Sequence, residues 1–240
     1  MLNAAKPIFS QIEEIVKDVP GWTPPDELFA LFNLAYITAG IPGDIIELGS
    51  WCGRSGAVLG LAAALTGRTK VYCIDLFPEL ADWQRNFDGT YSISLTIGGR
   101  TFTACTEHTV WAEPFERDIA PLYIRHAGVM EIFRETIARR GLDAIVTAHK
   151  GTLATFSEIA SPDLKCKLAF IDGDHSYHAV YEDIRCAERF LIPGGWICLD
   201  DAFCGNEGVD RAISELILDN ENYELGQQLT RKLFIARRRA

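Results

Sequence analysis

The sequence lacks any run of residues that could cross a membrane. Its longest uncharged stretch, residues 28–43, is shorter than the roughly 20 residues that a bilayer helix needs. The stretch is also interrupted by Asn33, Gly40, Pro42 and Gly43. No basic start followed by an apolar core and a cleavage site is visible, so no export signal is expected. We therefore expect a cytoplasmic protein without membrane contacts.

The chain is also short of positive charge. It has 23 Lys and Arg residues against 33 Asp and Glu residues, for a net charge of -10. Phosphate contacts need clustered Lys and Arg, so this balance argues against a nucleic-acid partner. The one basic cluster, residues 237–239, lies at the very C-terminus and is interpreted as a solvated tail.

No pair of cysteines has the C-x-x-C spacing of redox or zinc motifs. The cysteines are odd in number and scattered along the chain, which indicates reduced thiols rather than a disulfide framework. They are Cys52, Cys73, Cys105, Cys166, Cys186, Cys198 and Cys204.

The composition is otherwise that of an ordinary globular protein, with 48% hydrophobic and 23% charged residues. A length of 240 residues suffices for one large α/β domain, and we expect a single domain over residues 1–240.

The most informative stretch is IIELGSWCGRSGAVLGLAAAL, residues 45–65. An apolar run ends near Glu47, a turn follows with Gly49 and Gly53, and an Ala-rich helix completes the pattern. At the carboxyl end of a parallel strand, helix N–H groups and glycines let a nucleotide-like ligand approach the backbone. We expect a small-molecule cofactor here. The alternative is an ordinary glycine turn of an α/β protein.

The glycine spacing does not match a dinucleotide site. The G-x-G-x-x-G fingerprint needs a middle glycine, and Trp51 stands there, which disfavours an NAD-dependent dehydrogenase. Further along, the apolar run 71–77 contains Asp75. The distance along the chain from Glu47 to Asp75 is close to that at which a carboxylate on the second strand meets a ribose diol. An acid at a strand end is otherwise commonplace.

A second group of acids follows two later strands. One strand ends at Asp172, a helix is expected over 177–190, residues 193–195 predict a turn, and the next strand ends in Asp200 and Asp201. Adjacent parallel strands place these carboxylates at one edge of the sheet. Three hard oxygen donors at one point suit Mg²⁺ or a similar divalent cation. Helix capping or turn formation is the commoner role of such an acid pair.

Together, E-x-G-x-x-x-G-x-S, IDGDHSY, PGG and LDDAF resemble the metal-dependent macrolide-sugar and cephalosporin-type O-methyltransferases, or methyltransferase family 24. This is a branch of the class I S-adenosylmethionine-dependent methyltransferases, and catechol O-methyltransferase is a more distant likeness. The resemblance covers residues 45–77 and 145–203. It implies an α/β fold with a Rossmann-like, doubly wound, seven-stranded, mostly parallel sheet and an antiparallel C-terminal strand.

The resemblance also implies roles for single residues. The metal ligands fall on Asp172, Asp200 and Asp201, and the catalytic base falls on His175. By its position alone, one turn further on, His178 is a weaker rival for the base or a partner that supports it. Asp172 is counted as catalytic as well. The residues expected around S-adenosylmethionine are Glu47, Gly49, Ser50, Trp51, Gly53, Ser55, Asp75, Leu76, Gly151, Thr152 and Asp172.

The chemistry suits these assignments. Methyl transfer from a sulfonium needs an acceptor oxygen in line with the methyl carbon and preferably deprotonated. A bound cation lowers the pKa of the acceptor hydroxyl, and an imidazole such as that of His175 accepts the proton near neutral pH. The expected partner is a hydroxylated small molecule, such as a sugar, a phenol or another natural product. A protein that binds the cofactor without catalysis is the alternative.

Two segments fall outside the α/β alternation. Residues 1–43 predict a helical arm, with Asp26 as a helix cap and with residues 21–23 either over the pocket or as a surface hinge. Residues 78–128 are rich in aromatic residues and contain a hairpin signal at 98–99. A long insertion after a cofactor strand is typical of a lid that closes over the acceptor. A subunit interface is the alternative, and a homo-oligomer is compatible with both.

Overall fold

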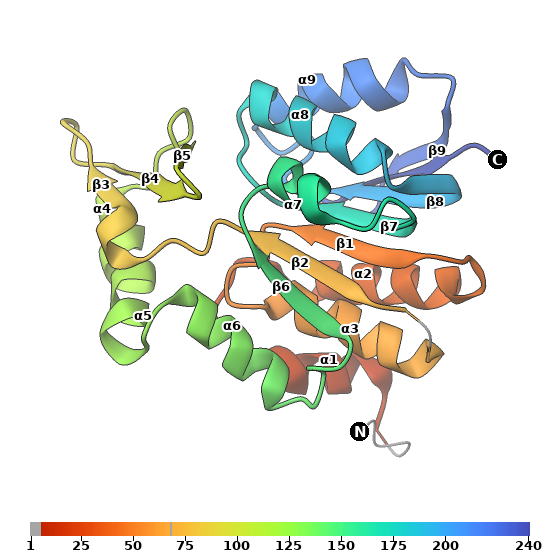
Figure 1. Cartoon of the computed structure of the whole chain (residues 1–240), viewed down its shortest axis with the longest axis horizontal. Coiled ribbons are helices and arrows are strands. Elements are labelled where there is room, and N and C mark those ends of the chain that lie inside the picture. Colours follow the sequence, from red (N-terminus) through yellow and green to blue (C-terminus); the bar gives the residue numbers. More distant parts are fainter. Residues whose placement is uncertain (1–5, 68) are drawn as a thin grey trace.

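A seven-stranded sheet forms the centre of the computed structural model, which describes residues 6–67 and 69–240 (Figure 1). Its strand order is β6-β2-β1-β7-β8-β10-β9, and all pairings are parallel except those of β10 with β8 and β9. The predicted doubly wound sheet with an antiparallel C-terminal strand is confirmed. The strands are β1 Asp44–Leu48, β2 Val71–Asp75, β6 Val146–Lys150, β7 Cys166–Ile171, β8 Leu191–Leu199, β9 Tyr223–Gln228 and β10 Phe234–Arg238.

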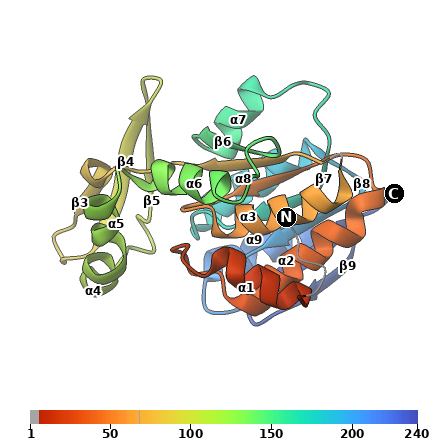
Figure 2. The same cartoon turned by 90° about the horizontal axis from the view of Figure 1, so that it is seen from below.

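Helices cover both faces of this sheet (Figures 1 and 2). One face carries α1 Ile8–Val16, α2 Pro25–Ile37, α3 Arg54–Thr66 and α6 Val129–Ala138, and the other carries α7 Leu153–Ile159, α8 Tyr177–Glu188 and α9 Glu207–Ile213. Neighbouring residues of β1 pack into different clusters, Ile45 under the first set and Ile46 under the second. Because both faces are covered, β1 is apolar throughout its middle rather than alternating. In the part of the chain that the structure describes, no helix is both long and apolar enough to cross a bilayer.

The sheet changes its winding direction between β1 and β7. From β1 the chain proceeds outward to β2 and β6, whereas β7, β8, β10 and β9 lie on the other side. In an open α/β sheet, ligands bind in the crevice at such a switch point, outside the carboxyl ends of the strands. The predicted glycine loop and Asp172 lie at these ends.

Two local predictions are wrong. Asp26 does not cap α2, because the helix begins at Pro25 and Pro24 occupies the cap position without a side-chain hydrogen bond. Proline suits the first helical position, where its missing N–H costs no hydrogen bond. Residues 193–195 do not separate α8 from a later strand. They lie inside β8 as a bulge, since Cys166 and Leu168 of β7 pair with Leu191 and Trp196 of β8.

The insertion after β2 forms a small subassembly beside the sheet (Figure 1). Its three antiparallel strands are β3 Trp83–Arg85, β4 Tyr91–Ile97 and β5 Arg100–Ala104. The predicted hairpin between β4 and β5 is confirmed, and Gly98 and Gly99 turn it with positive φ angles of 58° and 80°. Short helical segments complete it: α4 Ala112–Pro114, the π-helical turn η3 Phe115–Ile119 and α5 Ala120–Arg125. Elsewhere the chain has the short helical turns η1 Thr38–Gly40, η2 Leu80–Asp82 and η4 Ser214–Leu218.

Candidate active site

A cavity of about 550 Å³ lies at the carboxyl ends of β1, β2, β7 and β8. Residues 20–23 of the N-terminal arm and part of the insertion form its other walls. Most of the residues predicted for the site line this one cavity, whereas Glu47 and Gly53 are not on its wall. The predicted residues on the wall are Gly49, Ser50, Trp51, Ser55, Asp75, Leu76, Gly151, Thr152, Asp172, His175, Asp200 and Asp201.

The glycine loop brings the ends of β1 and β7 into contact. The Asp172 N–H donates to the Leu48 carbonyl at 2.9 Å, and the Gly49 N–H donates to the Ile74 carbonyl at 2.9 Å. Gly49 has a φ of +89°, and a Cβ built there would lie 1.7 Å from the Asp172 carbonyl oxygen. Only glycine therefore fits between the β1 loop and Asp172. Gly53 also has a positive φ, +84°, and begins α3 as its cap residue.

Glu47 supports this loop from beneath. Its side chain is fully buried, and Oε2 accepts a hydrogen bond from the Ser50 hydroxyl at 2.6 Å. Its Oε1 has no hydrogen-bond partner among residues 6–67 and 69–240. The structure thus places Glu47 behind the loop, where it orients Ser50, and its predicted contact with the cofactor stays a prediction.

Asp75 closes the other side of the loop. Its Oδ2 accepts the Trp51 N–H at 2.9 Å, and its Oδ1 accepts the Phe77 N–H at 2.6 Å. Burial raises the pKa of Asp75 to about 6, and these two backbone donors oppose that rise. Each carboxylate oxygen keeps a second lone pair, so the side chain can still accept hydroxyl groups of a ligand in the cavity.

Aromatic side chains from three segments meet across the cavity. The Trp51 ring lies 5.8 Å from that of Trp22 in the arm and 6.5 Å from that of Trp83 in the insertion. The buried indole N–H of Trp51 has no hydrogen-bond partner in the described part of the chain. A buried donor left unpaired is costly, and a ligand in the cavity is a suitable acceptor.

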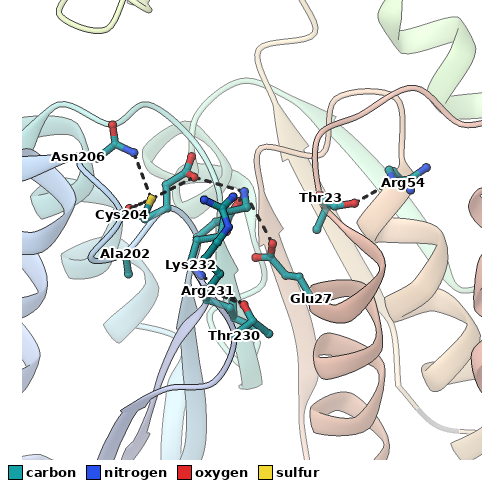
Figure 3. Close-up of polar contacts among 12 residues, drawn as sticks. Thr23, Glu27, Arg54, Ala202, Cys204, Asn206, Thr230, Arg231 and Lys232 are labelled. Carbon is teal, nitrogen blue, oxygen red and sulfur yellow. Dashed lines mark hydrogen bonds and ion pairs between the residues drawn. The ribbon is translucent and has the colours of Figure 1, made fainter.

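The arm is fixed in place by an arginine of α3. The Arg54 guanidinium donates to the carbonyl oxygens of Val16, Val19 and Thr23 at 2.7, 3.0 and 3.1 Å, and the last contact is visible in Figure 3. Because α3 begins at the glycine loop, these bonds hold the Gly21–Thr23 turn against the cavity. Of the two alternatives for this turn, the structure favours a place over the pocket.

A group of three titratable side chains lies at one end of the cavity. One ligand atom each from Asp172, His175 and Asp201 lie within 4.8 Å of one another. His175 Nε2 lies 2.9 Å from Asp201 Oδ2. Burial lowers the pKa of His175, but the bond to Asp201 outweighs it, and the pKa is raised overall. Burial likewise raises the pKa of Asp201, but His175 and Lys232 hold it at about 2.

Asp172 has a different electrostatic environment from Asp201. Burial raises the pKa of Asp172 well above its ordinary value, and the negative charge of Asp200 raises it further. Positive charge placed beside Asp172 would relieve this repulsion.

Asp200 is not a member of this group, and Lys232 binds one of its oxygens. Lys232 donates a hydrogen bond to Asp200 Oδ2, and its ammonium also lies 3.3 Å from Asp201 Oδ1 and 3.7 Å from Glu27 Oε2. Figure 3 shows Glu27 extending from α2 toward Lys232, which projects from the C-terminal hairpin. Burial lowers the pKa of Lys232, but Asp200 and the other acids raise it above its ordinary value. Burial, together with the neighbouring Asp200, raises the pKa of Glu27 to about 9.

These residues fit a divalent cation in part. Asp172, Asp201 and His175 converge with oxygen and nitrogen donors, which first-row divalent metals accept. Of the predicted ligands, Asp172 and Asp201 are brought together, whereas the Oδ2 atom of Asp200 is taken by Lys232.

Sequence reasoning missed Glu27, Lys232, His108 and Asp174. His108 of the insertion has its ring 6.1 Å from that of His175, and Asp174 Oδ2 accepts the Cys105 N–H at 2.7 Å, which joins the insertion to the β7–α8 loop. Glu27 carried a usable signal, because its helical spacing from the buried Leu31 places it on the inner face of α2. For Lys232 no sequence signal was present.

Comparison with known proteins identifies the family. A family model described as a methyltransferase domain, of methyltransferase family 24, matches residues 46–202, more than half of the chain. No curated protein matches.

Solved structures share the fold. The O-methyltransferase from Bacillus cereus in complex with S-adenosylhomocysteine has a TM-score of 0.60 at 16% identity, over 99% of this chain and 94% of that one. The O-methyltransferase TomG from Streptomyces achromogenes, in complex with S-adenosylmethionine, has a TM-score of 0.59 at 15% identity, over 100% and 93%. The O-methyltransferase NovP has a TM-score of 0.55 at 17% identity, over 92% and 84%. The chain therefore belongs to methyltransferase family 24 of the class I S-adenosylmethionine-dependent methyltransferases.

Proposed function

We propose that this protein transfers the methyl group of S-adenosylmethionine to a hydroxyl group of a small, uncharged organic molecule. The observation that carries the proposal is that one cavity contains both the glycine loop and the group Asp172, His175 and Asp201. A cofactor on the loop and an acceptor beside His175 would thus share one cavity, as direct transfer of the methyl group requires.

The cofactor roles follow the walls of the cavity. Asp75 is proposed to accept the ribose hydroxyls, Gly151 and Thr152 to lie against the adenine, and Ser55 in the first turn of α3 to lie near the methionine carboxylate. The helix N-terminus favours that negative group. The unpaired indole N–H of Trp51 supports a ligand with hydrogen-bond acceptors at this loop.

The proton of the acceptor hydroxyl is proposed to go to His175. When Nε2 carries the hydrogen that is donated to Asp201, Nδ1 is the free acceptor of the neutral ring. Asp201 thereby fixes the tautomer and stabilises the imidazolium that forms after proton transfer. His175 lines the cavity, so the acceptor can reach it.

The cation is the finer part of the proposal. Asp172 and Asp201 are proposed to hold Mg²⁺ or a similar divalent cation, and Asp200 joins them only where Lys232 releases it. When bound, such a cation lowers the pKa of the acceptor hydroxyl and holds its oxygen in place.

The acceptor end of the cavity supports an uncharged substrate. Apolar residues of the insertion line it, including Trp83, Ile93 and Ile119. The Arg and Lys side chains that the structure describes on the cavity wall are Arg54 and Lys232, and both are engaged in contacts within the protein. A phosphate or carboxylate on the acceptor would find no free basic partner there, which favours phenols and neutral sugars. A small acceptor also agrees with the net charge of -10, which disfavours nucleic acid.

Calorimetric titration with S-adenosylhomocysteine, with NAD in parallel, tests the cofactor half. We expect binding of S-adenosylhomocysteine and none of NAD. Transfer of labelled methyl from S-adenosylmethionine to a panel of phenols and neutral sugars then tests the reaction, with His175→Asn as the inactive control. Binding without transfer to any acceptor would favour the non-catalytic alternative, and absence of binding would refute the proposal.

A further inference from the structure

One buried lysine, Lys232, lies among the acids of the proposed cation site. Lys232 is 8% exposed, and its ammonium contacts three carboxylates from two parts of the chain: that of Glu27 in α2, and those of Asp200 and Asp201 just after β8. Lys232 also lies on the cavity wall. A buried ammonium surrounded by acids occupies the kind of position that a metal ion takes in an oxygen-donor site.

Lys232 uses the oxygens that a divalent cation would need. It takes Oδ2 of Asp200 and lies 3.3 Å from Oδ1 of Asp201, whose Oδ2 is held by His175. Asp200 Oδ1 has no hydrogen-bond partner within residues 6–67 and 69–240. A cation that binds between Asp172 and Asp201 would therefore share Asp201 with Lys232. Asp200 would be less available to that cation, because its Oδ2 already accepts a hydrogen bond from Lys232.

The positive charge of Lys232 also weakens the binding of a divalent cation. Two positive charges a few ångströms apart repel strongly in a partly buried site. A divalent cation at Asp172 and Asp201 would thus lose a ligand to Lys232 and would also be repelled by its ammonium.

We propose that Lys232 is a built-in cation of this active site that competes with the divalent cation for Asp200 and Asp201 and so makes divalent-cation binding weak. The inference rests on the proposed function, because it concerns the cation site of the same reaction. In this arrangement the lysine is a positioning residue: it holds the two acids in place whether or not a metal is bound.

Glu27 connects the Lys232 ammonium to the N-terminal arm. Neither of its carboxylate oxygens has a hydrogen-bond partner in the described part of the chain, and Lys232 is the cation 3.7 Å away. Loss of Lys232 would leave the Asp200 carboxylate buried without its cationic partner, and a divalent cation would supply that charge.

The test is Mn²⁺ binding to the full chain in the presence of S-adenosylhomocysteine. Binding is measured as the decrease of the electron paramagnetic resonance signal of free Mn²⁺. Lys232→Met removes the charge and keeps most of the volume, whereas Lys232→Arg keeps the charge. Lys167→Met is the matched control, because Lys167 is also a buried lysine, 1% exposed, but hydrogen-bonds Thr69 near the opposite end of β7.

We expect Lys232→Met to bind Mn²⁺ at least tenfold more tightly than the wild type, and Lys232→Arg and Lys167→Met to bind it within threefold of the wild type. Mn²⁺ should also raise the melting temperature of Lys232→Met more than that of the wild type. If Lys232→Met does not fold, Lys232→Gln serves for the same comparison.

Equal or weaker Mn²⁺ binding by the folded charge-neutral variant, including no binding by either protein, would overturn the inference. Binding of S-adenosylhomocysteine and methyl transfer by the wild type report separately on the proposed function, so the two failures are distinguishable.

Discussion

Replacing Gly49 with alanine tests the close contact between the glycine loop and Asp172. Its φ of +89° costs an L-residue about 1–2 kcal/mol. The added Cβ would lie 1.7 Å from the Asp172 carbonyl oxygen, so the backbone must shift, and overpacking of this kind costs about 1–3 kcal/mol more. Gly49→Ala should therefore lower the free energy of unfolding by about 2–5 kcal/mol, the sum of these two terms. At roughly 2–4 °C per kcal/mol for a chain of this size, the change is easily measured.

Gly67→Ala is the matched control for this variant. Gly67 ends α3 with a φ of +79°, and a Cβ there would meet nothing within 4 Å, so only the backbone term of about 1–2 kcal/mol applies. Urea unfolding gives the stabilities, and calorimetry gives the affinity for S-adenosylhomocysteine. We expect weakened cofactor binding for Gly49→Ala alone, because the shift separates the loop from Asp172. Equal losses of stability and unchanged cofactor affinity in the two variants would refute the reasoning.

Three further predictions concern His175 as the proposed base, Asp75 as the proposed ribose ligand, and the anchoring of the N-terminal arm by Arg54. His175→Asn should lower kcat by about 10²–10⁴-fold. The wild-type rate should rise with pH, with its midpoint above the ordinary range of a histidine, because the raised pKa of His175 delays formation of the neutral base; a flat pH profile would contradict this. Asp75→Ala should weaken S-adenosylhomocysteine binding at least tenfold by calorimetry, since it removes the acceptor of the Trp51 N–H as well as the ribose contact; unchanged affinity would exclude that role. Arg54→Met should expose residues 17–24 to limited proteolysis, because three carbonyl oxygens of the arm lose their donor; a protection pattern like that of the wild type would show that the arm is held otherwise.

The parts of the site that could be predicted are those that follow from strand ends. Glu47, Asp75, Asp172 and Asp201 each stand at or just after the carboxyl end of a strand, and parallel strands bring their carboxyl ends to one edge. Local sequence was sufficient there, because the glycine loop, the acids and the sheet order are mutually consistent.

Contacts between distant segments could not be predicted in this way. Lys232 reaches Asp200 because β10 inserts beside β8, and it meets Glu27 because α2 packs beneath the same edge. No local pattern carries that information. The capping prediction for Asp26 failed for a local reason, since Pro25 took the first helical position, and the turn predicted at residues 193–195 is a bulge that pairing with β7 keeps within the strand.

The position of β10 has a consequence for how the protein is made. β8 is completed at Leu199, but its second neighbour, β10, begins only at Phe234. During synthesis one edge of β8 is therefore unpaired until the segment 234–238 leaves the ribosome, and a nascent apolar strand with a free edge is open to pairing with other chains. A stalled or shortened nascent chain would thus present β8 to the cell as an aggregation-prone edge. Chaperone contact should be concentrated in the period after residue 199 has left the ribosome and before residue 234 has done so.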